Sequence, residues 1–416
     1  MATQPIAPSV PGVGGRPSGM RYVARQPILD LRGRVHGYEL LFRSGPEAAF
    51  SGDGNVATRT MLDNTVLFGL ENLTAGLPAF VNCTLESLTE QLVDILPPSM
   101  TVLEILETIE PTPDLIAACR KLKALGFRLA LDDFIWKPKF EPLIDLANYI
   151  KVDFSLSDAA ERQDLLRRLS HRAVAMLAEK VETQQEYQQA RNEGFTLFQG
   201  YYFCFPELIQ NAKVPSNRLF HLDILRQLHR DPLDLKKISP LVLRDASLTY
   251  RLLRLVNSPI YALRQQVSSI AGAILVVGET AFRRIATLAI LSEFNAEQPP
   301  EILHMALVRA RFCELAAALC GLDPDEQYLL GMMSLLPAMM RFPMEALVPE
   351  LPLRDEIRQA LLGLDNRERC LLAWIEGHER NDQAASHAIA EHHALNQQRL
   401  VQFFIDAVVW DATAHR

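Results

Sequence analysis

Acidic residues close several short apolar runs in the first half of the chain. The run Phe127–Phe134 contains two adjacent carboxylates near its end, Asp132 and Asp133. A run of this length, entered from a glycine, predicts a buried strand of a parallel sheet. Because charge is expensive inside a sheet, we expect the two carboxylates where the strand emerges. In an α/β barrel, the carboxyl ends of the strands carry the chemistry.

Other polar side chains occupy similar places in neighbouring runs. They are Glu39, Asn82, Glu104, Lys151, Glu179, Glu182 and Gln199. Oxygen ligands from Glu, Asn and Asp suit Mg²⁺, Mn²⁺ or Ca²⁺ rather than a metal that prefers thiolates. A cluster of this size could hold two divalent ions, which generate hydroxide and stabilise the leaving oxygen in phosphodiester cleavage. The lysine could orient the attacking water or neutralise phosphate charge. A solvated network of ion pairs is the alternative.

The elements that must position these side chains follow from an alternation of short apolar runs and amphipathic stretches. The runs cover residues 22–29, 37–42, 79–83, 101–105, 127–134, 149–152, 173–181 and 196–203. About eight strands with intervening helices predict a closed (β/α)₈ barrel. Only a hairpin-length turn at 30–34 separates the first two runs, so we expect one antiparallel strand, a modification of the regular barrel.

The 416 residues divide into four segments. We expect a disordered tail at 1–20, the barrel at 21–206, a linker at 207–220 and an all-α domain at 221–416. Ser239-Pro240 and Asp323-Pro324 predict helix starts in the last segment. The fold class is therefore α/β plus all-α, a modified (β/α)₈ barrel followed by an all-helical domain.

Composition narrows the function classes. A net charge of −8 gives no reason to expect nucleic-acid binding. The six cysteines contain no CxxC pair, which is typical of reduced thiols in a cytosolic protein. We find neither a signal peptide nor an apolar stretch long enough for a membrane helix, so we expect a cytoplasmic protein without membrane contact.

The polar residues lie in eight motifs of the first half. These are Gln26-Pro27-Ile28, Glu39-Leu40-Leu41-Phe42-Arg43, Asn82, Leu103-Glu104-Ile105, Asp132-Asp133-Phe134, Lys151-Val152-Asp153, Ala178-Glu179-Lys180-Val181-Glu182-Thr183 and Gln199-Gly200-Tyr201-Tyr202-Phe203. In this order they resemble an EAL domain over roughly residues 21 to 206. The resemblance implies a modified (β/α)₈ barrel that cleaves cyclic di-GMP to linear pGpG with two Mg²⁺ or Mn²⁺ ions.

The resemblance also implies a role for each matching position. The implied metal ligands are Glu39, Asn82, Glu104, Asp132 and Glu182, with Asp133 on the second metal. The implied catalytic residues are Lys151, which contacts the catalytic water, and Glu179, which supports the metal site. The implied ligand-binding residues are Gln26, Arg43 and Gln199.

Two features depart from the family pattern. The name-giving Glu-Ala-Leu is Glu-Leu-Leu at residues 39–41. The family usually has a Gly-rich, Ser-containing loop after Asp132-Asp133-Phe134, whereas Ile135–Phe140 contains no glycine and includes a proline. A loop that cannot take turns with φ > 0 is expected to position the supporting glutamates less well.

The helical half carries a second resemblance. The segments Leu252–Tyr261 and Val267–Gly278 resemble an HDOD domain, an all-α signalling module related to metal phosphohydrolases. Gly331–Leu336 stands where a Gly-Leu-Leu-His-Asp-like segment is common, so we expect no metal site there. The methionines of the patch Met332, Met333, Met339, Met340 and Met344 are either helix core or an adaptable partner surface.

Two hypotheses follow. The first is a bacterial-type signalling protein whose barrel is a metal-dependent cyclic di-GMP phosphodiesterase and whose helical half is an output domain for a protein partner. The alternative is a catalytically degenerate protein that acts as a cyclic di-GMP receptor or as an interaction scaffold. The complete ligand set favours the first and the loop Ile135–Phe140 favours the second. A homodimer is compatible with both.

Overall fold

The computed structural model describes residues 22–43, 70–90, 92–204, 216–230, 232–258, 267–351 and 353–414. The predicted tail at 1–20 and most of the predicted linker at 207–220 lie outside these residues. The first helix of the second half, α8, begins at Ser216, within the predicted linker.

Eight strands close into a barrel in their sequence order. They are β1 (Tyr22–Asp30), β2 (Val35–Arg43), β3 (Ala79–Cys83), β4 (Thr101–Ile105), β5 (Arg128–Leu131), β6 (Tyr149–Asp153), β7 (Ala175–Glu179) and β8 (Leu197–Gln199). Strand β1 is antiparallel to both of its neighbours, β2 and β8, and the other pairs are parallel. The predicted barrel and its antiparallel strand are confirmed.

The barrel interior is layered because side chains alternate along each strand. One apolar layer fills its lower part; it consists of Ile28, Phe80, Val102, Ala130, Tyr149, Leu177 and Leu197. Two residues further along β3 to β8, the inward positions are polar; they are Asn82, Glu104, Asp132, Lys151, Glu179 and Gln199. The alternation of side chains along the strands thus places a polar layer next to the apolar layer, at the carboxyl ends of the parallel strands.

Helices cover the outside of the parallel strands. The described ones are α2 (Leu70–Leu73), α3 (Leu85–Thr89), α4 (Pro113–Ala124), α5 (Glu141–Ile144), α6 (Ala159–Leu169) and α7 (Gln184–Glu193). Helix α7 begins with a capping box, in which Thr183 and Glu186 satisfy each other's backbone N–H groups, and ends at Gly194 in the left-handed region. These signals hold the start of α7 directly behind the end of β7.

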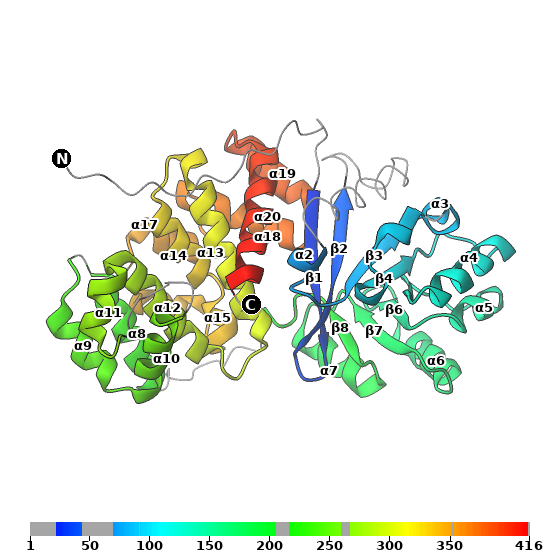
Figure 1. Cartoon of the computed structure of the whole chain (residues 1–416), viewed down its shortest axis with the longest axis horizontal. Coiled ribbons are helices and arrows are strands. Elements are labelled where there is room, and N and C mark those ends of the chain that lie inside the picture. The colour runs from blue at the N-terminus through cyan, green and yellow to red at the C-terminus, as the bar shows by residue number, and fades with distance from the viewer. Residues whose placement is uncertain are drawn as a thin grey trace.

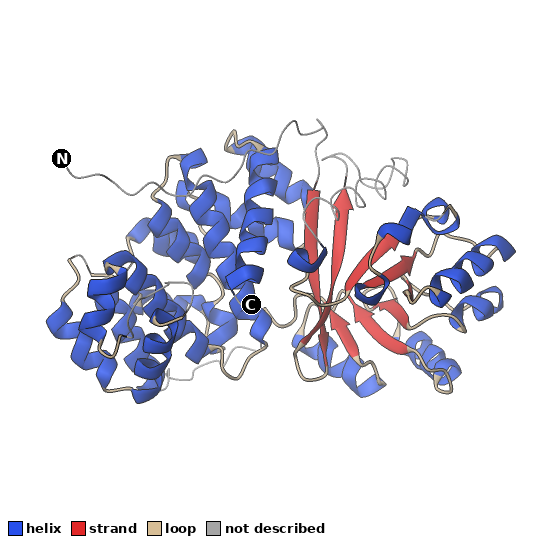
Figure 2. Ribbon diagram, viewed as in Figure 1, coloured by secondary structure: helices blue, strands red, loops and turns tan. Residues whose placement is uncertain are grey.

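The second half is all helical (Figure 2). Its helices are α8 (Ser216–Leu228), α9 (Leu235–Leu243), α10 (Ala246–Val256), α11 (Ile270–Val277), α12 (Glu279–Phe294), α13 (Pro300–Cys320), α14 (Pro324–Met333), α15 (Leu336–Met340), α16 (Met344–Leu347), α17 (Asp355–Leu361), α18 (Cys370–Glu379), α19 (Gln383–His392) and α20 (Gln397–Ala414). None of the helices in the described ranges is long and apolar enough to cross a membrane.

Two expectations for this half have clear outcomes. The start at Asp323-Pro324 is confirmed, whereas the start at Ser239-Pro240 is wrong, because α9 is capped by Asp234 and contains Pro240 in its interior. Four methionines of the patch, Met332, Met333, Met339 and Met340, are fully buried. Those four are therefore helix core rather than a partner surface.

The helical half packs against the barrel beside the β1–β2 hairpin. Strands β1 and β2 are joined by a tight turn, so no crossover helix runs between them. Helices α18 and α20 lie beside β1 instead, and α20 also packs on α2 (Figure 1). The two halves thus share the β1–β2 hairpin.

Gly200 tests the packing at the carboxyl end of β8. An added Cβ would lie 2.0 Å from the carbonyl oxygen of Val181, at a φ of +142°. We expect Gly200→Ala to lower the free energy of unfolding by about 3 kcal/mol or more, because neither backbone can move freely. Gly194→Ala is the control: its φ is also positive, but no atom lies within 4 Å of the new Cβ, so about 1–2 kcal/mol is expected. Urea unfolding measures both, and equal losses would contradict the clash.

Candidate active site

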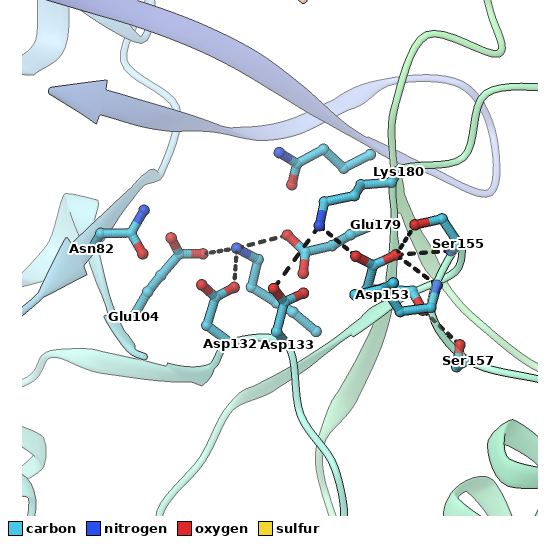
Figure 3. Close-up of polar contacts among 12 residues, drawn as sticks. Asn82, Glu104, Asp132, Asp133, Asp153, Ser155, Ser157, Glu179 and Lys180 are labelled. Atoms are coloured by element: carbon cyan, nitrogen blue, oxygen red, sulfur yellow. Dashed lines mark hydrogen bonds and ion pairs between the residues drawn. The ribbon is translucent and has the colours of Figure 1, made fainter. Parts of the chain in front are cut away.

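A buried lysine stands at the centre of the polar layer. The Nζ atom of Lys151 lies 2.7 Å from Glu104 Oε1, 2.7 Å from Asp132 Oδ1 and 2.8 Å from Glu179 Oε1 (Figure 3). Glu39 Oε2 lies further away, at 3.4 Å. The side chain is only 1% exposed. The structure therefore brings together five of the predicted site residues, from strands β2, β4, β6 and β7 and the end of β5.

The charges of this cluster do not balance, because four carboxylates face one ammonium group. Burial raises the pKa of Glu104 well above its ordinary value, and the nearby Glu39 adds to the shift. Burial also raises the pKa of Glu179 to about 8, although Lys151 acts in the opposite direction. Burial by itself lowers the pKa of Lys151, but the surrounding carboxylates outweigh it and hold that pKa well above the ordinary value. The site is short of positive charge.

Three amide side chains extend the cluster towards β1. Asn82 Nδ2 donates to Glu39 Oε1 at 3.0 Å. Gln199 Nε2 lies 2.7 Å from Glu39 Oε2 and 2.9 Å from Gln26 Oε1. The predicted ligand-binding residues Gln26 and Gln199 are therefore connected to the carboxylates through Glu39.

Several buried oxygens accept no hydrogen bond from any residue the structure describes. They are Asn82 Oδ1, Glu104 Oε2, Glu179 Oε2 and Gln199 Oε1. Each such oxygen costs about 1–3 kcal/mol when it is left without a partner. No three His, Cys, Asp or Glu side chains in the described ranges already surround one metal position, since Lys151 holds the centre of the carboxylates. The oxygen donors and the surplus negative charge nevertheless fit a divalent cation.

A second, smaller cluster lies beside the first and includes a lysine that the sequence analysis did not single out. Lys180 Nζ pairs with Asp153 and lies 3.9 Å from Asp133 Oδ2. Asp153 is held in turn by Ser155, whose N–H and Oγ donate at 2.8 and 2.6 Å. The available sequence signal was the position of Lys180 directly after Glu179, at the end of a strand. Asp132 and Asp133 therefore belong to different charge clusters.

The loop Ile135–Phe140 is ordered without glycine. The chain turns at Asp133, whose φ is +39°. None of the residues 135–140, all of which the structure describes, has a positive φ. The Phe134 N–H donates to the Lys151 carbonyl at 2.9 Å, and the rings of Phe134 and Phe140 meet edge to face. A small pocket between β4, β5 and this loop is lined by Asp132 and Asp133 on one side and by Ile135 and Lys137 on the other.

Two predicted site residues stand apart. Glu182 is exposed; its backbone N–H donates to Glu186 Oε2 at 2.8 Å, and no described contact joins its carboxylate to Lys151 or to the other predicted ligands. Partial desolvation by the surrounding chain and the nearby Glu186 raise the pKa of Glu182. Arg43 ends β2, and its side chain lies outside the described residues. Metal binding by Glu182 and ligand binding by Arg43 stay predictions.

Comparison with known proteins identifies two domain families in the chain. The model of the EAL domain matches residues 71–206, and the model of the HDOD domain matches residues 214–348. Both resemblances seen in the sequence are thereby confirmed. Strands β1 and β2 precede the matched part of the EAL domain.

Two curated relatives extend over nearly the whole chain. YuxH of Bacillus subtilis is 36% identical over 400 residues, which cover 94% of this chain and 97% of YuxH. CdgJ of Vibrio cholerae, named a cyclic di-GMP phosphodiesterase, is 35% identical over 368 residues, which cover 87% of this chain and 85% of CdgJ. A solved structure of BlrP1 from Klebsiella pneumoniae, a complex with calcium and cyclic di-GMP, is 24% identical over 44% of this chain and 55% of BlrP1, with a TM-score of 0.38.

The charge imbalance around Lys151 predicts a pH-dependent stability. A carboxyl group whose folded pKa of about 8 exceeds its unfolded value of about 4.3 stabilises the fold below pH 4.3 and loses that contribution as the pH rises through 8. With EDTA present, we therefore expect the free energy of unfolding to fall by roughly 3 kcal/mol between pH 5 and pH 8 through Glu179. Urea unfolding of the unmodified chain and of Glu179→Gln isolates the contribution of Glu179 to the free energy of unfolding. Identical dependence of that free energy on pH in the two proteins would contradict the prediction.

Proposed function

Because the chain belongs to the family of proteins that join an EAL domain to an HDOD domain, we propose that its barrel binds cyclic di-GMP and hydrolyses it to linear pGpG. Hydrolysis adds one water molecule across a phosphodiester bond, so that one ring phosphate becomes terminal and a ribose hydroxyl leaves. The relative CdgJ, which carries that activity in its name, aligns with both halves of the chain and supports this choice of substrate.

One observation carries the proposal: the polar layer at the mouth of the barrel holds more buried carboxylates than its single ammonium group can neutralise. A site designed only for stability would pair these charges or replace them with apolar side chains, because buried charge is costly. Surplus carboxylates at the catalytic end of a barrel instead favour a role with a cationic partner.

We assign the metal to oxygen donors of this layer, namely Glu39, Asn82, Glu104 and Asp132, with Glu182 as the further ligand expected from the sequence. Asp133 would serve a second ion from the neighbouring cluster. Bound Mg²⁺ or Mn²⁺ lowers the pKa of a coordinated water and stabilises the leaving oxygen. The unpartnered oxygens of Asn82 and Glu104 are the donors that such an ion would satisfy.

The other side chains then have distinct tasks. The Lys151 ammonium is charged at neutral pH and uses its three N–H donors on carboxylates of the layer. Once a bound cation draws one of those carboxylates away, the released N–H can hold the attacking water or a phosphate oxygen. Glu179 Oε1, 2.8 Å from Lys151 Nζ, orients that ammonium group. Gln26, Gln199 and Arg43 are assigned to the ligand itself. The Gln26 amide offers both a donor and an acceptor, as recognition of a guanine edge requires.

Hydrolysis by the purified chain tests the proposal. We expect cyclic di-GMP to be converted to pGpG with Mg²⁺ or Mn²⁺ and not with EDTA. Glu104→Gln should lower kcat/KM at least about 100-fold, because it removes a charged ligand at constant shape. Glu86→Gln, on the exposed face of α3, is the control and should leave the rate unchanged. Chromatography of the product measures the rate, and unchanged turnover in Glu104→Gln would refute the assignment.

A receptor without turnover is the second candidate, and the loop Ile135–Phe140 favours it. Ile135 is 72% exposed beside the pocket at Asp132 and Asp133, where the family usually has small residues. Calorimetry in parallel distinguishes the two: binding without product indicates a receptor, and the absence of binding excludes both nucleotide functions. A protein partner for the helical half, a homodimer and a cytoplasmic location stay predictions.

A further inference from the structure

Two helices of the second half form hydrogen bonds with the β1–β2 hairpin next to the active site. Helix α13 meets β2, where the Tyr38 hydroxyl donates to Glu301 Oε2 at 2.9 Å in a fully buried contact. Helix α18 meets β1, where Gln26 Nε2 donates to the backbone carbonyl of Glu379 at 3.4 Å. Tyr38 and Gln26 are the immediate neighbours of the site: Tyr38 precedes Glu39 in β2, and Gln26 is paired with Glu39 across the two strands.

A continuous path of hydrogen bonds therefore leads from the carboxylates into the helical domain. Glu39 accepts from Gln199, Gln199 donates to Gln26, and Gln26 donates to the last residue of α18. Carbonyl groups in the last turn of a helix lack intrahelical partners, which leaves the Glu379 carbonyl free to accept this bond. The bond spans 353 positions of the sequence.

The end of α18 is held in place by a buried ion pair. Arg309 of α13 approaches Glu379 Oε2 with Nε at 3.0 Å and Nη2 at 2.6 Å, and its Nη1 donates to Ser334 Oγ at 3.0 Å. Both side chains of the pair are less than 10% exposed. A forked, buried contact of this kind fixes position more strictly than a single point charge does.

We propose that the helical domain completes the nucleotide site of the barrel, with Arg309 and Glu379 as positioning residues that act through Gln26. This inference rests on the proposed binding of cyclic di-GMP. One N–H of Gln26 and one lone pair of its oxygen are used by Glu379 and Gln199, so the amide plane is fixed. The second N–H and the second lone pair remain for the edge of a guanine base.

Glu379→Gln tests the role of the pair. We expect KM for cyclic di-GMP to rise about 10-fold while kcat stays within about twofold, because the amide is misplaced while the carboxylates are untouched. Arg309→Lys, which keeps the charge but loses the fork, should shift KM in the same direction by less. If the unmodified chain binds without turnover, the dissociation constant from calorimetry replaces KM.

A matched control separates positioning from general destabilisation. Glu193→Gln breaks another buried Arg–Glu pair, in which Arg162 approaches with Nε at 2.7 Å and Nη2 at 3.0 Å, on the outer helices α6 and α7. It should lower the melting temperature comparably and leave KM unchanged. Equal KM values in Glu379→Gln and Glu193→Gln would overturn the inference. Failure of the unmodified chain to bind the nucleotide would instead overturn the proposed function.

A separate observation concerns two cysteines at the far ends of the same helices. Cys320 ends α13 and Cys370 begins α18, and their sulfur atoms lie 3.3 Å apart. Cys370 is buried, whereas Cys320 is partly exposed. The hydrogen bond from Cys370 lowers the pKa of Cys320, and Arg367 contributes to the same shift. A partly exposed thiol whose sulfur lies 3.3 Å from that of a second thiol is the arrangement of a redox-active pair.

We infer that Cys320 and Cys370 form a reversible disulfide with a small-molecule disulfide of the glutathione type as oxidant. The Cys320 thiolate attacks one sulfur of the oxidant and releases the first small thiol. The Cys370 thiol then loses its proton and attacks the Cys320 sulfur, which releases the second. The protein pair loses two electrons and the oxidant gains them. The product would tie the end of α13 to the start of α18.

Alkylation after equilibration in glutathione buffers tests the pair in the full chain. In excess oxidised glutathione, we expect four of the six cysteines to remain alkylatable after denaturation, and peptide mapping should link Cys320 to Cys370. Cys119→Ser should still form the link, whereas Cys320→Ser and Cys370→Ser should not. Six alkylatable thiols under oxidising conditions, or a link between other cysteines, would contradict the inference.

Discussion

The ammonium group of Lys151 holds the mouth of the barrel together. Four carboxylates point at it from β2, β4, β7 and the end of β5, and three of them, Glu39, Glu104 and Glu179, are buried, where an unpaired charge is costly. The single positive charge of Lys151 pairs with these carboxyl groups but cannot neutralise all of them. The apolar layer two residues earlier along each strand supplies packing energy that offsets the cost of burying these charges. The fold therefore places more carboxyl groups than ammonium groups at the carboxyl end of the barrel.

The tight turn between β1 and β2 explains why the helical domain can pack directly on the strands that border the active site. In a regular barrel, a crossover helix would separate these strands and cover their outer face. Here α18 and α20 lie beside β1 (Figure 1). Glu301 of α13 accepts a hydrogen bond from Tyr38 of β2. The helical domain is thus a structural wall of the barrel, and its contacts fall on the strands that carry Gln26 and Glu39.

The features that can be predicted from the sequence are those that leave a pattern among neighbouring residues. Alternation and strand length predicted the barrel, and the short turn at 30–34 predicted its antiparallel strand. Polar residues at strand ends predicted the cluster around Lys151, because strands of one sheet place equivalent positions side by side. The contact of Gln26 with Glu379 had no such signal, since it joins residues 353 positions apart. Ser239-Pro240 predicts a helix start from a local pattern, but α9 begins earlier and continues through Pro240.

The adjacent aspartates at the end of β5 show how the backbone divides one sequence motif between two tasks. Asp132 continues the alternation of the strand, so its carboxylate enters the barrel and meets Lys151. The reversal at Asp133, with a φ of 39°, turns the next carboxylate out of that layer towards Lys180. Left-handed backbone is costly for a residue with a side chain, and it persists only where the surroundings impose it. Here the Phe134 bond to the Lys151 carbonyl and the contact of Phe134 with Phe140 impose it. Packing of the loop Ile135–Phe140 therefore holds Asp133 in a left-handed conformation without a glycine. The position of the second cluster depends on that packing.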